Sequence, residues 1–317
     1  MAGPRRVTAP RVTPRRDTRR RAGRWRQHGA AYSLIAPVLI LTVAFSVLPL
    51  VMVIRRSLYK GNIFDTDLKF SGLANYRDVF RTGGEHALGV TAVYTVAFVV
   101  ITMVVGFLVA LLLDVRLPGL RWVRGLFVIP LVVPAVATAL IWFTLFAPDT
   151  GLVNRVATGV GLPQATLDSG RTALVAVIAF GAWQFFGEVV LLYLAALKSL
   201  PGDVLEAAVI DGASAWQRLR YVRWPLLRNQ TALVGVIATL TGLQAFTQIY
   251  VLTPDGGPGG STETALYYVY QQAFGLGAGG SAGRADAMSV VLFLISLAIT
   301  VAQLAIVARG TRSEAAS

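Results

Sequence analysis

Six long stretches, five without any charged side chain and one with a single charge, decide what this chain can fold into. Each is longer than the roughly 20 residues with which an α-helix crosses about 30 Å of hydrocarbon. One of them is interrupted by a single charge, Glu188, and the first is too long to be the apolar core of a cleavable signal peptide. The sequence therefore predicts an all-α, polytopic integral membrane protein with six transmembrane helices. The expected spans are about 30–54, 87–113, 125–148, 172–197, 229–254 and 287–308.

Composition agrees with a membrane protein and excludes several kinds of site. Only 14% of the 317 residues are charged, against about 25% in soluble domains. The absence of cysteine excludes disulfides, thiolate metal sites and cysteine nucleophiles. His28 and His86 are the only histidines, and both lie outside the apolar runs. We therefore expect neither a histidine-based metal site nor a catalytic triad.

The distribution of basic residues predicts the orientation. Twenty of the 29 Lys and Arg residues fall in the tails and in alternate loops, 114–124 and 198–228, which places both termini in the cytoplasm. The tail 1–29 is basic and contains prolines, so we expect it to be disordered and to contact anionic membrane lipid. Nucleic-acid binding is not expected, because Trp25 is the only aromatic residue in this tail. The tail 309–317 is also predicted to be cytoplasmic.

The polar gap 198–228 has a pattern that a simple linker would not need. Pro201 suits a first helical turn, and Asp203 and Glu206 place negative charge near the positive end of that helix. Gly212 can adopt a positive φ and end the helix. The pattern predicts a first short helix at the cytoplasmic surface.

A second short helix is predicted directly after it. Ser214 and Gln217 have the spacing of a capping box, and Pro225 is expected to reset the chain before the fifth span. Spacing alone also fits an amphipathic linker that lies in the membrane interface.

The glycine-rich stretch GGPGGST, residues 256–262, does not form a nucleotide site. It lacks the lysine of a phosphate-binding loop, contains a proline, and follows an apolar span rather than a strand. We expect no cofactor in this chain, so energy for active transport has to come from another subunit.

Two stretches resemble a known family. EAAVIDGASAWQRLRYVRWPLL resembles the EAA loop of ABC importer permeases, and YVLTPDGGPGGSTETALYYVYQQAF resembles the outer loop of carbohydrate-uptake permeases of the maltose and glycerol-3-phosphate kind. The dipeptide PD in the second stretch departs from that pattern. The residues that fill the EAA positions are Glu206, Ala207, Ala208, Asp211, Gly212, Ala213 and Pro225.

The resemblance implies a type I ABC importer permease fold and a transport subunit rather than an enzyme. Such permeases pair with a second, related permease in the bacterial cell membrane. Two copies of a cytoplasmic ATPase bind ATP and Mg, and an extracytoplasmic solute-binding protein or lipoprotein delivers the substrate. The EAA loop is expected to dock on the ATPase. A permease for a glycerophosphodiester, an amino acid or a peptide is the alternative; a channel or a membrane enzyme fits less well.

Polar residues inside two spans are candidates for the substrate pathway. Glu188 lies near the middle of the fourth span, where a carboxylate costs roughly 2.5–3.5 kcal/mol unless it faces a cavity or a partner. Amides, hydroxyls and aromatic rings suit a sugar-like polyol. The alternative is that these groups hold helices together. The other candidates are Trp183, Gln184, Gln244, Thr247 and Gln248.

Overall fold

The computed structural model describes residues 34–61, 69–115, 120–275 and 281–315. The expected tail 1–29 lies outside these residues. The chain divides into two compact units, 1–52 and 53–317, which are described separately.

Within the described residues, five helices are long and apolar enough to cross a membrane, and a bent pair makes up a sixth candidate. The first candidate runs from Leu34 to Arg56 and contains the π-helical turn η1 (Val43–Val47) followed by α2 (Leu48–Arg56). The remaining long helices are α4 (Gly84–Leu113), α8 (Gly170–Lys198), α11 (Trp224–Leu243) and α14 (Ala282–Ala315). These positions agree with the apolar runs, so the all-α polytopic fold is confirmed.

Short elements connect the long helices. A two-stranded antiparallel ribbon pairs β1 (Tyr59–Lys60) with β2 (Lys69–Phe70). The short helices are α3 (Ala74–Arg81), α7 (Leu152–Gly159), α9 (Gly202–Ile210), α10 (Ala215–Gln217), α12 (Thr247–Leu252) and α13 (Ala265–Phe274). The π-helical segment η2 (Arg218–Arg223) joins α10 to α11, and the 3-10 turns η3 (Pro254–Gly256) and η4 (Pro258–Gly260) precede α13.

The third predicted span, 125–148, corresponds to a bent pair of helices rather than to one straight helix. The segment consists of α5 (Leu120–Val132) and α6 (Ala135–Leu145), which meet at an angle of 102°. Pro134 explains the break, because proline has no N–H to donate and disfavours helical geometry at the residue before it.

The fifth predicted span, 229–254, corresponds to a longer candidate span, Ala215–Leu252, which differs from the prediction in its start and in its continuity. The helix does not begin anew at Pro225, because α10, η2 and α11 follow one another without a gap from Ala215 to Leu243. Pro225 lies in the first turn of α11, directly after the wider π-helical turns of η2. At the other end the helix stops at Gln244 and resumes as α12 at Thr247.

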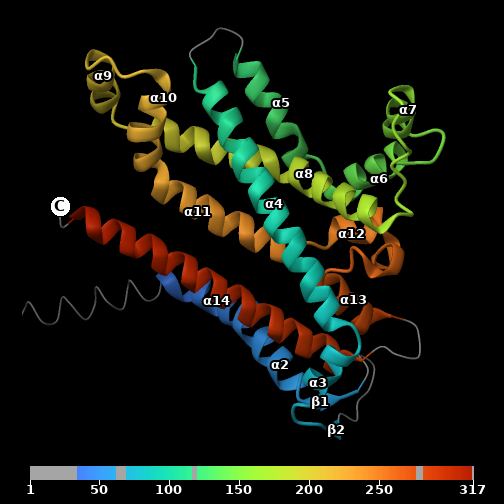
Figure 1. Cartoon of the computed structure of the whole chain (residues 1–317). Coiled ribbons are helices and arrows are strands. Elements are labelled where there is room, and N and C mark those ends of the chain that lie inside the picture. The colour runs from blue at the N-terminus through green and yellow to red at the C-terminus, as the bar shows by residue number, and fades with distance from the viewer. Residues whose placement is uncertain (1–33, 62–68, 116–119, 276–280, 316–317) are drawn as a thin grey trace, which may run out of the picture. The chain divides into compact units, whose positions relative to one another are not determined.

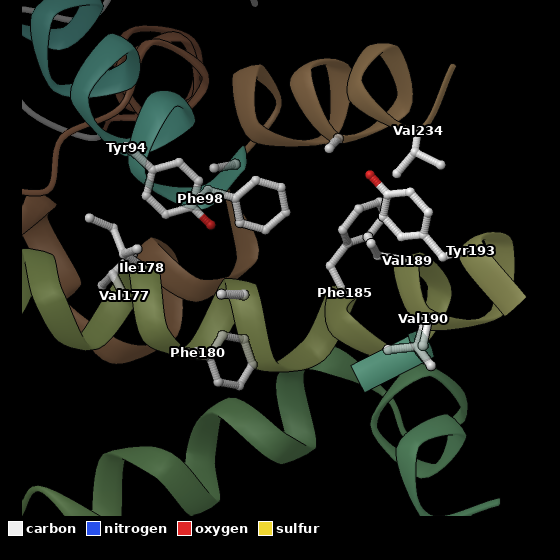
Figure 2. Packing of buried hydrophobic residues seen from close by; sticks show 14 of the residues in the cluster. Tyr94, Phe98, Val177, Ile178, Phe180, Phe185, Val189, Val190, Tyr193 and Val234 are labelled. Carbon is white, nitrogen blue, oxygen red and sulfur yellow. The ribbon is translucent and has the colours of Figure 1, made fainter. Parts of the chain in front are cut away.

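The core of the larger unit lies along α8, which packs against α4 and α5. Figure 2 shows aromatic side chains of α4 and α8 facing each other, among them Phe98 and Phe185, whose ring centroids are 5.4 Å apart. Small residues permit the close approach: a Cβ at Gly106 of α4 would lie 2.6 Å from Cγ1 of Val189. In Figure 1, α8 and α11 lead from α9 and α10 at one end of this unit toward α12 and α13 at the other.

Candidate functional site

A polar cavity of about 290 Å³ lies where both broken helices meet α4 and α8; we call it the inner cavity. The α5–α6 break contributes Leu131 and Ala135, and the α11–α12 break contributes residues 244–248. The rest of its lining is Tyr94, Phe98, Gly181, Gln184, Phe185 and Thr241. Two discontinuous helices therefore converge on one cavity.

The breaks themselves favour a functional cavity. Inside a bilayer, irregular backbone is tolerated where protein buries it or where it lines a water-filled space. Thr264, at the start of α13, donates a hydrogen bond from Oγ1 to the carbonyl oxygen of Ala245, at 2.8 Å. This bond satisfies one carbonyl that the interrupted helix leaves free. In transporters, such half-helices are typical of substrate sites.

One hydrogen bond fixes the side chains at the centre of the inner cavity. Gln248 Nε2 donates to the hydroxyl oxygen of Tyr94 at 2.7 Å. Gly181 makes room for this hydroxyl, because a Cβ at that position would collide with it. The amide of Gln248 and the phenol of Tyr94 are thus held together across α12 and α4.

The chemistry of the inner cavity is polar and uncharged. Among the described residues that line it, none carries a formal charge; amides, hydroxyls and aromatic rings share the surface. A neutral solute with many hydroxyl groups finds hydrogen-bond partners there. An anion or a cation finds no opposite charge on this chain's part of the wall.

Four of the six predicted pathway residues lie together in this cavity. They are Gln184, Gln244, Thr247 and Gln248. Gln244, Thr247 and Gln248 do not share one helical face as expected; they meet because the helix breaks between the first and the other two.

The other two predicted pathway residues, Trp183 and Glu188, do not line the cavity. The Trp183 ring packs 5.5 Å from Trp142 and 6.1 Å from Phe180. Glu188 is half-buried and lies one helical turn beyond Gln184, past the level that the cavity reaches on α8.

Sequence reasoning missed Tyr94, Phe98 and Gly181. Aromatic residues and glycine within an apolar run are typical of ordinary helix packing, so no local pattern distinguishes them. Their part in the cavity depends on which helices meet, and a single sequence does not contain that information.

At the other end of α8 and α11, the EAA positions form a compact helix-ending turn. The helix α9 ends at Ile210 and Gly212 has φ of +74°. Ala213 N donates to the carbonyl oxygen of Ala208 at 3.0 Å, and Gly212 N donates to that of Val209 at 3.1 Å. These two bonds define a Schellman motif. The motif needs a bond between residues five positions apart, and Ala208 and Ala213 have this separation.

The second helix is joined firmly to this turn. Ser214 N donates to Gln217 Oε1 at 2.7 Å, and Gln217 N donates to Ser214 Oγ at 3.3 Å, so the predicted capping box is present. Arg218 Nη1 donates to the carbonyl oxygen of Ala213 at 2.9 Å. Within the described residues, neither Glu206 nor Asp211 forms an ion pair with the second helix. The hydrogen bond from Arg218 to Ala213 is therefore the side-chain contact that joins the second helix to the turn.

Within the larger unit, the turn and its flanking helices lie at one end (Figure 1). Glu206, Ala207, Asp211 and Gly212 are exposed, and a Cβ at Gly212 would meet nothing within 4 Å. Large apolar side chains are exposed as well, among them Ile210, at 85%. A rigid element with uncovered apolar side chains is suited to docking against another protein.

The loop between α12 and α13 depends on residues that tolerate positive φ. Gly256, Gly257, Gly259 and Gly260 all have φ between 62° and 80°. Across the loop, Thr262 Oγ1 donates to Thr253 Oγ1 at 2.7 Å. The glycine-rich motif thus forms a tight structural loop.

Glu263 lies within this loop, and His86 of α4 lies beside it. Burial raises the pKa of Glu263, and the charge of His86 lowers that pKa in part. His86 Nε2 lies 3.0 Å from the carbonyl oxygen of Gly260, at hydrogen-bonding distance. These contacts connect the loop to the first turn of α4.

Comparison with known proteins gives consistent matches. Residues 102–312 match the family described as binding-protein-dependent transport system inner membrane component. The trehalose/maltose transport system permease protein MalF of Thermococcus litoralis is 30% identical over 283 residues, which are 89% of this chain and 94% of that protein. The sn-glycerol-3-phosphate transport system permease protein UgpA of Agrobacterium fabrum is 31% identical over 275 residues, 86% of this chain and 92% of that protein.

Solved structures have the same fold. A bacterial ABC transporter involved in the import of the acidic polysaccharide alginate superposes with a TM-score of 0.78 at 18% identity. The match covers 92% of this chain and 99% of that one. A bacterial alginate ABC transporter in complex with an alginate pentasaccharide-bound periplasmic protein gives a TM-score of 0.75 at 20% identity, over 88% of this chain and 93% of that one.

Proposed function

Because the chain belongs to the binding-protein-dependent transport system inner membrane component family, and is thus a permease subunit of an ABC importer, we propose that it imports a neutral sugar or sugar-like polyol. It forms half of the translocation pathway, and a second, homologous permease forms the other half. As a family of transport components, these proteins are not enzymes.

The observation that carries the proposal is the uncharged polar wall of the inner cavity. Gln184, Gln244 and Gln248 present amides there, and Tyr94 and Phe98 present rings, so one surface offers hydrogen bonds and apolar contact together. A sugar needs both, because its hydroxyl groups require partners and its ring faces are apolar. A phosphate or a zwitterion would bring charge into a low-dielectric site that supplies no counter-charge from this chain. Among the solutes named for the relatives, a neutral sugar therefore fits this wall better than glycerol 3-phosphate.

The turn between α9 and α10 is proposed as the coupling element. Two copies of a cytoplasmic ATPase bind ATP and Mg, and the exposed turn at Gly212 docks on one copy. Glu206 and Asp211 are about 140° apart around the helix at 100° per residue, so they cannot meet the same partner group. We expect one of them to contact basic groups of the ATPase.

The remaining assignments concern the membrane. The chain is a multi-pass protein of the bacterial inner membrane, and the basic-residue distribution supports cytoplasmic termini. An extracytoplasmic solute-binding protein delivers the substrate to the face that carries the outer loop.

Transport by the assembled complex tests the proposal. The chain is reconstituted in liposomes with its partner permease, ATPase and binding protein, and ATP-dependent uptake is measured for maltose, trehalose, glycerol 3-phosphate and a dipeptide. We expect uptake of a neutral saccharide, and Gln248→Ala is expected to reduce it. Gln164→Ala, an exposed residue of an outer loop, is the matched control. Uptake of the anionic or zwitterionic solutes alone would overturn the proposal.

A further inference from the structure

A second cavity, of about 550 Å³, lies between α12, η3 and α13; we call it the outer aromatic cleft. Tyr250, Tyr270 and Phe274 supply aromatic rings to its wall, and Asp255 and Gln271 supply polar groups. None of these residues belongs to the inner cavity or to the coupling turn.

The three rings form a contiguous aromatic platform, in which the planes of Tyr250 and Tyr270 are nearly perpendicular, at 81°. The Tyr270 centroid lies 5.3 Å from that of Tyr250 and 5.4 Å from that of Phe274. Tyr250 is 47% exposed and Phe274 is 59% exposed. The platform therefore exposes aromatic surface, mainly that of Tyr250 and Phe274, to the cleft.

One residue connects this platform with the inner cavity. Phe246 lines the inner cavity, and its ring also lies 5.5 Å from Tyr250 and 5.3 Å from Tyr270. Phe246 immediately precedes α12, at the break in the fifth span. The two cavities are thus neighbours, and a single aromatic side chain stands between them.

The polar groups of the cleft are held in place by local geometry. Asp255 has φ of +59°, a conformation that few residues other than glycine adopt and that Asp and Asn tolerate best. Its backbone and the side chain of Gln271 both hydrogen-bond to Tyr267. The amide of Gln271 is thus fixed beside the rings by a hydrogen bond, and the backbone of Asp255 places an exposed carboxylate next to them.

We propose that the outer aromatic cleft is a second saccharide-binding subsite, in which one ring of a neutral sugar stacks on Tyr270, the nearly perpendicular ring of Tyr250 contacts its edge, and Asp255 and Gln271 bind its hydroxyl groups. From there the sugar passes Phe246 into the inner cavity. The carboxylate of Asp255 repels anionic solutes, so the cleft also selects for neutral ones. This inference rests on the proposed function and adds a site to it.

The test compares two substitutions of one ring. In the reconstituted complex, uptake of the neutral saccharide that the wild type transports is measured over a range of concentrations. Tyr270→Leu keeps apolar volume but removes the ring; we expect the apparent KM to rise about tenfold with little change in maximal rate, the effect of losing one strong aromatic contact. Tyr270→Phe keeps the ring and loses the hydroxyl together with its hydrogen bond to Tyr250, so stacking is retained and the KM is expected to stay close to that of the wild type.

The charge is tested separately. In Asp255→Asn the side chain still hydrogen-bonds and still tolerates the positive φ, but the negative charge is gone. We expect glycerol 3-phosphate to inhibit saccharide uptake by this variant more strongly than it inhibits the wild type.

The outcomes separate the two hypotheses. A wild-type KM in Tyr270→Leu, or an equal rise in Tyr270→Leu and Tyr270→Phe, would overturn the cleft as a stacking subsite while the proposed function stands. Unchanged inhibition in Asp255→Asn would overturn the role in charge selection. Failure of the wild type to transport any neutral saccharide would overturn the proposed function and the subsite together.

Discussion

Replacement of Gly212 by valine is the sharpest test of the coupling turn. Gly212 has φ of +74° and forms the centre of the Schellman motif that ends α9. A Cβ there meets no atom within 4 Å, so the substitution causes no steric clash with the rest of the chain. Its cost is confined to the backbone, because a β-branched residue disfavours positive φ.

The expected magnitude follows from this conformation. Holding a non-glycine residue in such a region costs about 1–3 kcal/mol. The two hydrogen bonds of the motif each contribute about 1 kcal/mol, and the exposed turn has little packing to hold it in place. The penalty is therefore comparable to the local stability of the turn. The native geometry becomes a minor state, while the apolar spans remain unaffected and insert normally.

Two control variants separate backbone strain from other effects. Asparagine tolerates positive φ, so the Gly212→Asn variant is expected to retain most of the uptake and of the ATP hydrolysis. Gly202→Val adds the same side chain at a site that is equally open but does not have positive φ, and is expected to be active. We expect Gly212→Val to reach the membrane in normal amount, yet to lose substrate-stimulated ATP hydrolysis and uptake. Wild-type transport by Gly212→Val with the ATPase bound would show that the turn is only a linker.

Three further predictions use other parts of the chain. In a cysteine-free chain, Ser214→Cys is expected to be protected from an impermeant maleimide on intact cells and Val160→Cys to be labelled; the reverse pattern would refute the orientation. Gln248→Ala is expected to lower uptake more than Glu188→Gln, because only Gln248 lines the inner cavity; equal effects in uptake assays would contradict this. Burial raises the pKa of Glu263, so its contribution to stability is present below its unfolded pKa and is lost as the pH rises through the raised folded pKa. Glu263→Gln should therefore flatten the pH dependence of thermal stability in that window, and an unchanged profile would argue against it.

The coupling turn was predictable from sequence because its determinants are local. Gly212 as helix terminator and the Ser214–Gln217 capping box each depend on residues a few positions apart, and both are present. Pro225 was misjudged for a physical reason. Proline usually ends a helix, but the π-helical turns of η2 precede it and the helix continues into α11.

The inner cavity was predictable only in part. Polar residues in apolar spans are conspicuous, so Gln184 and Gln248 could be named from the sequence. The break at Gln244–Phe246 has no proline to announce it, and the sequence alone predicted an unbroken helix there. The contribution of Tyr94 depends on contacts between α4, α8 and α12, which are distant in sequence.

The continuity of the helix that starts at Ala215 gives the coupling turn a direct connection to the cavity. Arg218 ties the turn to the start of this helix, and Gln244 at its far end lines the inner cavity. The 29 residues from α10 to Leu243 span about 43 Å at 1.5 Å per residue. A break at Pro225 would have placed a hinge between the turn and the membrane. Because the helix instead remains continuous up to Gln244, we expect a displacement at the turn to move the edge of the cavity. The chain is thus discontinuous where substrate is proposed to bind and continuous where force is proposed to be transmitted.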